Sequence, residues 1–338
     1  MIISVCILAK NEADTIGDML VQISRQTFLK RTAGTVNLHV LANGCTDGTV
    51  AEARKCASLF EGTCAQLFVH EIEQGGKSRS WNKAVHELSH PDTTIFVFID
   101  PDVKLLSSSV IQDLLNELAR DPSLPVCGGY PVKDVHAKEH KSYFDRFTLA
   151  ISAKAKPIGV INGSLYAMRS EVAREIWLPN DIPGEDGFLN AMVTTRGFTT
   201  PIGQYVVKTA EHPTHSFKAH SSSEFFAHEQ RMIVGTVINR WIFEYLWSLH
   251  LQQPAGELIR RWNGDNPDWV EAIIRKRTQG KMWSVPLQII FGRFSTNKGS
   301  WLRQMAYLPL ATLATLLTVP PAVVANGRLK KRGAAQFW

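Results

Sequence analysis

Cysteine is scarce in this 338-residue chain, and the five cysteines that it has are scattered. Their number is odd and none of them form the close pairs that bind zinc, so we expect neither a disulfide framework nor a cysteine metal site. A reducing compartment is the plain interpretation of this usage. The cysteines are Cys6, Cys45, Cys56, Cys64 and Cys127.

The pattern of a signal peptide is missing as well. The apolar run at residues 2–8 has no basic residue before it and is cut short by Lys10, Asn11 and Glu12. A secretory signal needs a basic start and a longer apolar stretch. We therefore expect this run to be the first strand of the fold.

Charge of one sign does not dominate the chain. Lys and Arg outnumber Asp and Glu by 37 to 31, which gives a net charge of +6 and a pI near 9.0. The basic residues are scattered, which argues against nucleic-acid binding, but the balance suits anionic partners such as nucleotides or lipid head groups. With 44% apolar residues, the chain has ample core for one large domain or two modest ones.

Strands and helices alternate over the first hundred residues, which predicts a mainly parallel α/β sheet with right-handed crossovers. Four polar segments would then lie together at the carboxyl edge of that sheet, where α/β proteins bind ligands. We expect strands at residues 1–8, 36–42, 65–71 and 93–99, and helices at 13–24, 49–59 and 107–120.

The fourth strand ends in Asp100-Pro101-Asp102. Two carboxylates at a sheet edge suit Mg2+, which prefers oxygen ligands and shares them with substrate phosphates. An Asp-Pro pair also starts ordinary turns. Similarly, Gly75-Gly76-Lys77 at a helix start suits an anion, although a solvated basic helix start has the same composition.

Four segments resemble, in order, the nucleotide-sugar half of family 2 glycosyltransferases of the GT-A fold. They are Asn11-Glu12, the turn at residues 43–49, the Gly-Gly-Lys segment that continues to Asn82, and Asp100-x-Asp102. Glu185-Asp186, followed by Arg196-Gly197-Phe198, resembles the acceptor half of that family. The resemblance covers about residues 1–215.

The resemblance implies a role for each of these positions. Asp186 is the base that deprotonates the acceptor, and Glu185 holds the acceptor or shapes the site, although acids also suit any helix N-terminus. Mg2+ or Mn2+ is held by Asp100 and Asp102, with His215 as the first candidate and His212 as the second for a completing ligand. The nucleotide is lined by Ala9, Asn11, Glu12, Asn43, Lys77, Asn82 and Asp100.

The sequence departs from the family pattern at two places. Ala42-Asn43 replaces the acids that commonly recognise uracil, so the donor base is left open, although an amide both donates and accepts hydrogen bonds. The Gln-x-x-Arg-Trp signature of processive members is unfulfilled near Arg231 and Arg240. The sequence therefore favours a non-processive enzyme. We also expect a glycine-interrupted strand at residues 158–168, beneath the acceptor.

Residues 304–327 carry no charge, and a basic cluster follows at residues 328–332. The length of the uncharged run suffices for a membrane span, but Pro309, Pro320 and Pro321 would break a helix. A re-entrant or interfacial segment at the cytoplasmic face of a membrane is one interpretation. A buried helical hairpin that packs on the catalytic domain or on another protomer is the alternative.

Together these observations predict a GT-A domain with a nucleotide-sugar half at residues 1–125 and an acceptor half at 126–220, then a helical extension at 221–338. By resemblance, the function is metal-dependent, inverting transfer from a nucleotide-diphosphate sugar to a saccharide or lipid-linked acceptor, in cell-surface polysaccharide or glycolipid synthesis. A nucleotidyltransferase is one rival, although no glycine-rich loop follows the first strand. A nucleotide-sugar-binding scaffold without turnover is the other, although its acids would be expected to be lost.

Overall fold

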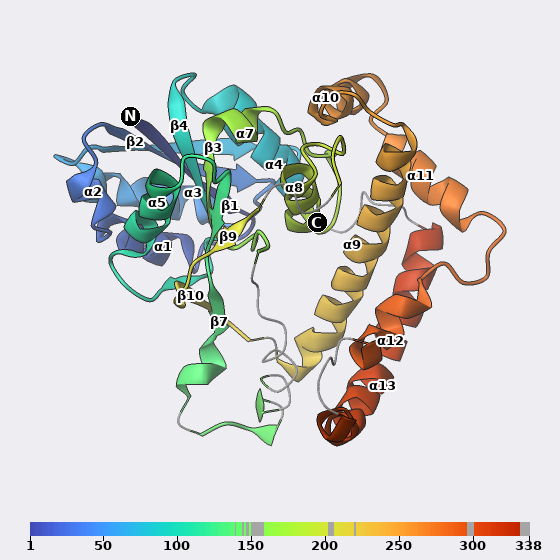
Figure 1. The fold of residues 1–338 in the computed structure, drawn as a ribbon. Helices are drawn as coiled ribbons and strands as arrows, with labels where there is room; N and C mark the ends of the chain where they lie inside the picture. The colour runs from blue at the N-terminus through green and yellow to red at the C-terminus, as the bar shows by residue number, and fades with distance from the viewer. Residues whose placement is uncertain are drawn as a thin grey trace.

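The structure is a computed structural model, and it describes residues 1–138, 140–143, 145–146, 149, 159–201, 206–219, 221–295 and 301–331. It has a sheet domain on one side and a group of long C-terminal helices on the other (Figure 1). Residue 158 of the strand predicted at 158–168, and residues 296–300 and 332–338 of the predicted extension, lie outside the described residues.

The central sheet has seven strands in the order β3-β2-β1-β4-β8-β6-β9. Its first four strands are parallel, as predicted. They are β1 (Ile2–Ala9), β2 (Thr35–Asn43), β3 (Ala65–Ile72) and β4 (Thr93–Ile99). Helices connect them: α1 (Ile16–Ser24), α2 (Phe28–Arg31), α3 (Thr49–Lys55), η1 (Cys56–Phe60), α4 (Lys77–Lys83) and η2 (Ala84–Leu88).

The sheet continues with shorter strands after α5 (Val110–Arg120). β8 (Leu165–Arg169) is antiparallel to β4 and to β6 (Val126–Gly128), and β6 is parallel to β9 (Lys208–Thr209). A three-stranded sheet beside it has the order β5-β10-β7. Its strands are β5 (Lys104–Leu105), β10 (His215–Phe217) and β7 (Pro131–Lys133), and η3 (Asp134–Ala137) follows β7.

The strand predicted at residues 158–168 was wrong in its first part. Residues 159–164 form a turn, and the strand begins at Leu165. Gly159 has a φ of +72°, which extended backbone does not adopt. The glycines of this segment therefore serve the turn that leads into β8 and not the strand itself.

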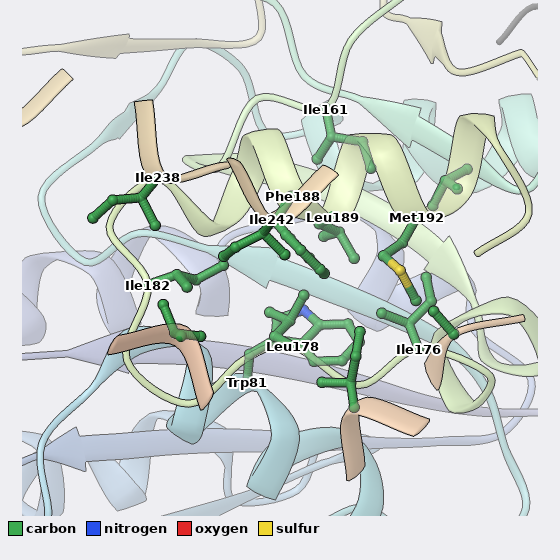
Figure 2. Packing of buried hydrophobic residues seen from close by; sticks show 14 of the residues in the cluster. Trp81, Ile161, Ile176, Leu178, Ile182, Phe188, Leu189, Met192, Ile238 and Ile242 are labelled. Carbon is green, nitrogen blue, oxygen red and sulfur yellow. The ribbon is translucent and has the colours of Figure 1, made fainter. Parts of the chain in front are cut away.

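The two faces of the sheet bury separate apolar clusters, because successive side chains of a strand point to opposite faces. Val5, Ile7 and Val97 pack with the buried faces of α1 and α5. Cys6 and Phe98 belong to the other cluster, with α8 (Glu185–Thr194) and α9 (Ser222–Ser248). Figure 2 shows this second cluster, with Trp81 facing Phe188 and Leu189 of α8.

The C-terminal part is helical, as predicted. α9 begins with a capping box, in which the Ser221 side chain accepts from the Glu224 N–H and the Glu224 side chain accepts from the Ser221 N–H. α9 lies between the sheet domain and α13 (Figure 1). The other helices are α7 (Ser170–Arg174), α10 (Gly256–Asp265), α11 (Trp269–Thr278), α12 (Leu287–Ser295) and α13 (Trp301–Lys331).

The expectation that prolines would break the uncharged run was wrong, because α13 continues through Pro309, Pro320 and Pro321. An interior proline costs a helix about 3 kcal/mol or more, and the packing of α13 on α9 and α12 offsets that cost. Within the described part of the chain, no helix combines the length and the apolar character that crossing a membrane requires.

Candidate active site

The parallel strands bring the predicted loops to one edge of the sheet. Ala9 lies beside Ala42 in the register of β1 and β2, and Ile7 lies beside Ile99 in the register of β1 and β4. The segments that follow Ala9, Asn43 and Ile99 therefore emerge side by side. The motifs that follow one another in the sequence therefore lie side by side on one surface of the fold.

Lys77 joins the two halves of this surface. Its Nζ lies 2.9 Å from Asp100 Oδ1 and 3.0 Å from Glu185 Oε1. All three side chains are mostly buried, with 19%, 24% and 11% of their surfaces exposed. A single cation thus holds the end of β4 against the start of α8, although these segments are 85 residues apart in the chain.

The charges of Lys77, Asp100 and Glu185 shift the pKa values of Lys77 and Asp100. Burial lowers the pKa of Lys77, but the carboxylates of Asp100 and Glu185 outweigh it and hold that pKa well above its ordinary value. Burial raises the pKa of Asp100, and the opposing effect of Lys77 does not fully cancel it. One ammonium serves two carboxylates, so the group keeps an excess of negative charge that is available to a second cation.

Asp186 follows Glu185 in the first turn of α8 and is partly exposed. Burial and the neighbouring charge of Glu185 raise the pKa of Asp186, although the Gly187 N–H donates to its Oδ1 at 2.8 Å. Asp186, Glu185, Lys77 and Asp100 line a shared cavity of about 10 Å³, which is the size of one water.

Gly163 faces Asp186 across this cavity. A Cβ at Gly163 would lie 3.1 Å from Asp186 Cβ and 3.5 Å from Asp186 Oδ2, which is tighter than most Cβ contacts in folded proteins. A side chain at this position would therefore press on Asp186, and glycine lets the backbone of residue 163 lie against it. The glycine of the predicted acceptor segment has a concrete purpose at this position.

The predicted nucleotide-lining residues organise the loops around one another. Asn43 is 3% exposed and its Oδ1 accepts from the Gly76 N–H at 2.7 Å. Asn11 adopts a φ of +55°, and its Oδ1 accepts from the Thr46 N–H at 2.8 Å. Burial, with the charges of Asp102 and Asp100, raises the pKa of Glu12. These contacts hold the loops after β1, β2 and β3 together at the carboxyl edge of the sheet.

Asn82 lies elsewhere. It is 3% exposed, donates to the Leu178 carbonyl at 2.8 Å and accepts from the Leu178 N–H at 2.9 Å. Both ends of its amide are thus occupied by the backbone that leads toward Glu185. The structure places this residue behind the site, in a position to support it.

The predicted metal ligands differ in availability. Asp102 is exposed, and its carboxylate has no hydrogen bond or ion pair to the part of the chain that the structure describes. Asp100 contacts Lys77. His215 is fully buried, its Nε2 lies 2.7 Å from Ser164 Oγ and its Nδ1 lies 2.8 Å from Thr214 Oγ1. Burial lowers the pKa of His215 to about 4. His212 is exposed.

A divalent cation fits this site together with a diphosphate. Over the described ranges, no group of three or more Asp, Glu, His or Cys side chains forms a cage of its own. The exposed carboxylate of Asp102 and the adjacent Asp100 offer oxygen ligands, and Mg2+ is commonly bound by one or two carboxylates plus substrate phosphates. The donor set therefore fits a metal that arrives with, and is completed by, a phosphorylated ligand.

Two supporting contacts had no signal in the sequence. Arg79 Nη2 lies 3.0 Å from Asp181 Oδ1 and 2.9 Å from Asp181 Oδ2, which fixes α4 to the segment before α8. Asn239 of α9 donates through Nδ2 to the Gly184 carbonyl at 2.7 Å. Each partner lies far away in the chain, so only the folded arrangement shows these pairs.

α9 approaches the acid pair closely because small residues line the contact. Gly184 has a φ of +79°, a left-handed conformation that favours glycine. A Cβ at Gly235 of α9 would lie 2.8 Å from the Pro183 carbonyl oxygen, so that position requires glycine. Helix α9 thus sets the position of the turn from which Glu185 and Asp186 emerge.

Comparison with known proteins identifies the family and the fold of the chain. The family model described as glycosyl transferase family 2 matches residues 4–177. No curated protein matches the sequence. Among solved structures, a mannosyltransferase from Pyrobaculum calidifontis, PcManGT, shares 17% identity with a TM-score of 0.56, and the match covers 96% of this chain and 86% of that one.

Two further structures are similar at lower scores. TarS residues 1–349 from S. aureus share 12% identity with a TM-score of 0.49, covering 98% of this chain and 92% of that one. Glucosyl-3-phosphoglycerate synthase from Mycobacterium tuberculosis shares 20% identity with a TM-score of 0.48, covering 70% and 79%. At these identities the similarity concerns the fold alone.

Proposed function

Because the chain belongs to glycosyl transferase family 2, and is therefore a glycosyltransferase of the GT-A fold, we propose that it transfers a sugar with inversion from a nucleotide-diphosphate donor. The acceptor in this proposal is a saccharide or a lipid-linked sugar. The observation that carries it is the double ion pair of Lys77 with Asp100 and Glu185. Through Lys77, the donor-side carboxylate of Asp100 is joined to Glu185, the residue before the candidate base Asp186.

Asp186 is the base in this reaction. Inverting transfer requires one group to take the proton of the acceptor hydroxyl as that oxygen attacks the anomeric carbon. The raised pKa of Asp186 makes its carboxylate a stronger base than an ordinary aspartate. Asp186 lines the cavity together with Gly163, whose lack of a side chain leaves the Asp186 carboxylate uncovered on that side. Glu185, held by Lys77, shapes the acceptor side.

Asp102 and Asp100 hold Mg2+ or Mn2+ against the diphosphate in this proposal, and a bound divalent cation stabilises the negative charge of a departing diphosphate. The free carboxylate of Asp102 supports this assignment. The similar mannosyltransferase was solved with GDP-Man and Mn2+, which also supports it. His215, whose two ring nitrogens contact Ser164 and Thr214, stays a predicted ligand that would have to exchange one of these contacts.

We place the reaction in cell-surface polysaccharide or glycolipid synthesis, at the cytoplasmic face of a membrane. Five free cysteines support a reducing compartment. The acid-free C-terminal segment supports proximity to anionic lipid.

The first test is donor binding followed by thermal unfolding. UDP, GDP, dTDP and CMP sugars are each added with and without Mn2+, because a ligand that binds the folded site raises the melting temperature by mass action. We expect a metal-dependent rise with one diphosphate series, and its loss in Asp102→Ala. Asp92→Ala is the matched control, since Asp92 precedes β4 at the opposite edge of the sheet and its side chain is 85% exposed.

The second test separates the rival functions by product. A glycosyltransferase releases a nucleoside diphosphate in the presence of acceptor, and Asp186→Asn should abolish that release while donor binding persists. In a separate reaction with a nucleoside triphosphate and a sugar phosphate, release of pyrophosphate would instead identify a nucleotidyltransferase. Donor binding without turnover on saccharide or lipid-linked acceptors would identify a binding scaffold and contradict the proposal.

A further inference from the structure

Helix α13 carries an exposed row of large aliphatic side chains, which we call the aliphatic stripe. Most of these positions are three or four residues apart, and at 3.6 residues per turn all of them fall on one half of the helix circumference. Their exposed fractions run from 39% at Val319 to 62% at Leu316. The stripe consists of Met305, Leu308, Leu313, Leu316, Val319, Val323 and Val324.

The opposite face of α13 is buried, and apart from Pro321 and Leu329 its buried side chains in the described residues are alanine, threonine and asparagine. This face packs on α9 and α12, and α13 lies along the outer side of α9 (Figure 1). Asn326 shows how polar the contact is, because its Oδ1 accepts from the Ser284 N–H at 2.7 Å and its Nδ2 donates to the Met282 carbonyl at 3.1 Å. The buried residues include Ala311, Ala314, Thr315, Thr318, Ala322 and Ala325.

This arrangement reverses the pattern of a helix that faces water. A surface helix in water buries its large apolar residues and exposes its polar ones. Helices in a lipid environment do the opposite, with small residues at helix–helix contacts and large apolar residues outward, because lipid is as apolar as a leucine side chain. The face that α13 presents is therefore suited to hydrocarbon.

The charge of the C-terminal segment indicates which kind of partner binds the aliphatic stripe. From residue 272 to residue 338 the sequence has no Asp or Glu and has eleven Lys and Arg. Lys330 and Lys331 are exposed in the last turn of α13. A second copy of the chain would bring another acid-free basic segment to the same face, so like charges would meet without partners. An anionic lipid surface complements both the charge and the aliphatic stripe.

We propose that the aliphatic stripe and the adjacent lysines dock α13 on a bilayer that contains anionic lipid, with the helix lying on the bilayer surface. α9 separates this face from the acid pair, since its Asn239 contacts Gly184 while α13 packs on α9 as well. The sheet domain then faces the aqueous side. The proposal does not depend on the reaction, because it rests on exposure and charge in the C-terminal helices alone.

The test is co-sedimentation of the full chain with vesicles of phosphatidylcholine, and with vesicles in which part of it is replaced by phosphatidylglycerol. We expect binding to the anionic vesicles that weakens in high salt. Leu316→Asn with Val323→Asn should lower the partition coefficient roughly tenfold. Lys330→Gln with Lys331→Gln should lower it by about fivefold per residue.

Matched control variants distinguish binding through the aliphatic stripe from non-specific binding to vesicles. Leu59→Asn with Leu106→Asn removes two aliphatic side chains that are 37% and 47% exposed on the sheet domain. Lys30→Gln with Arg31→Gln removes two exposed charges at the end of α2. Both controls should bind vesicles as the unaltered chain does.

The outcomes are decisive because each variant is also checked for its melting temperature and for donor binding. Folded stripe variants that bind vesicles like the unaltered chain would overturn the proposal, and so would absence of binding to anionic vesicles. A dimer in light scattering that dissociates in the stripe variant, without vesicle binding, would assign the stripe to a second copy instead. Unchanged donor binding in these variants keeps the result separate from the proposed reaction.

Discussion

Asn239 contacts the turn that presents the candidate base, although it lies on a helix beyond the matched family region. Replacing it with alanine removes the 2.7 Å hydrogen bond to the Gly184 carbonyl in a place where Asn239 is only 6% exposed. Loss of the donor leaves a poorly solvated carbonyl, which costs about 1–3 kcal/mol. The buried Oδ1 of Asn239 has no hydrogen-bond partner among the described residues, so removing it recovers part of the free energy lost with the Gly184 hydrogen bond.

The net loss of folding stability in Asn239→Ala should therefore be small, about 1 kcal/mol. The effect on turnover should be larger, because Glu185 and Asp186 follow Gly184 directly and a displacement of 1 Å at a reacting group costs roughly a hundredfold in rate. We expect kcat to fall about tenfold to a hundredfold. The KM for the donor should stay unchanged, since the donor side is built on β1, β2 and β4.

The assay is release of nucleoside diphosphate as the donor concentration is varied, together with urea unfolding. Asn239→Asp retains the volume but presents an oxygen to the Gly184 carbonyl, so it should be impaired at least as much. Thr236→Ala is the control, because Thr236 lies exposed on α9 and its hydroxyl contacts the Met232 carbonyl of the same helix. A folded Asn239→Ala enzyme with the kcat of the unaltered chain would refute the reasoning.

Three further changes test the site. Lys77→Met leaves two largely buried carboxylates without their cation, so the free energy of unfolding in urea should fall by about 3 kcal/mol. Unchanged stability would mean that the ion pairs contribute nothing. Gly163→Val should retain the donor-induced rise in melting temperature but lower turnover more than tenfold, because its Cβ meets Asp186. Burial and Glu185 raise the pKa of Asp186, so kcat should be high above that raised pKa and fall below it, at a higher pH than for an ordinary aspartate; a pH-independent kcat would argue against Asp186 as base.

Much of the donor half could be predicted because its signals are local. Each strand, turn and helix start from Ile2 to Asp102 is encoded within a few residues, and parallel pairing then brings the loops to one edge without further information. The roles inside that edge depend on distant partners. Asn82 illustrates this, since it stands in the predicted segment but its amide is taken by Leu178, 96 residues away.

The reversed pattern of α13 was hidden for a different reason. In the sequence, residues 304–327 are uncharged on every side, so the helix has no polar face that would show which side is buried. Only the packing on α9 and α12 shows that Ala311, Ala314, Thr315 and Thr318 face inward and that the leucines and valines of the aliphatic stripe face outward. Small side chains permit close contact between helices. The hydrophobic periodicity of the sequence does not reveal which side of the helix makes that contact.

Helix α9 connects these two observations. Gly235 and Asn239 on one side of it fix the turn before Glu185, while α13 packs on α9 as well. Helix α9 cannot shift relative to α13 without moving the acid pair, because packed interiors transmit displacement and do not absorb it. Docking of α13 on a bilayer would thus fix the orientation of the catalytic edge toward a lipid-linked acceptor. Turnover on such an acceptor in anionic vesicles should therefore fall in the stripe variants, while turnover on a water-soluble acceptor should not.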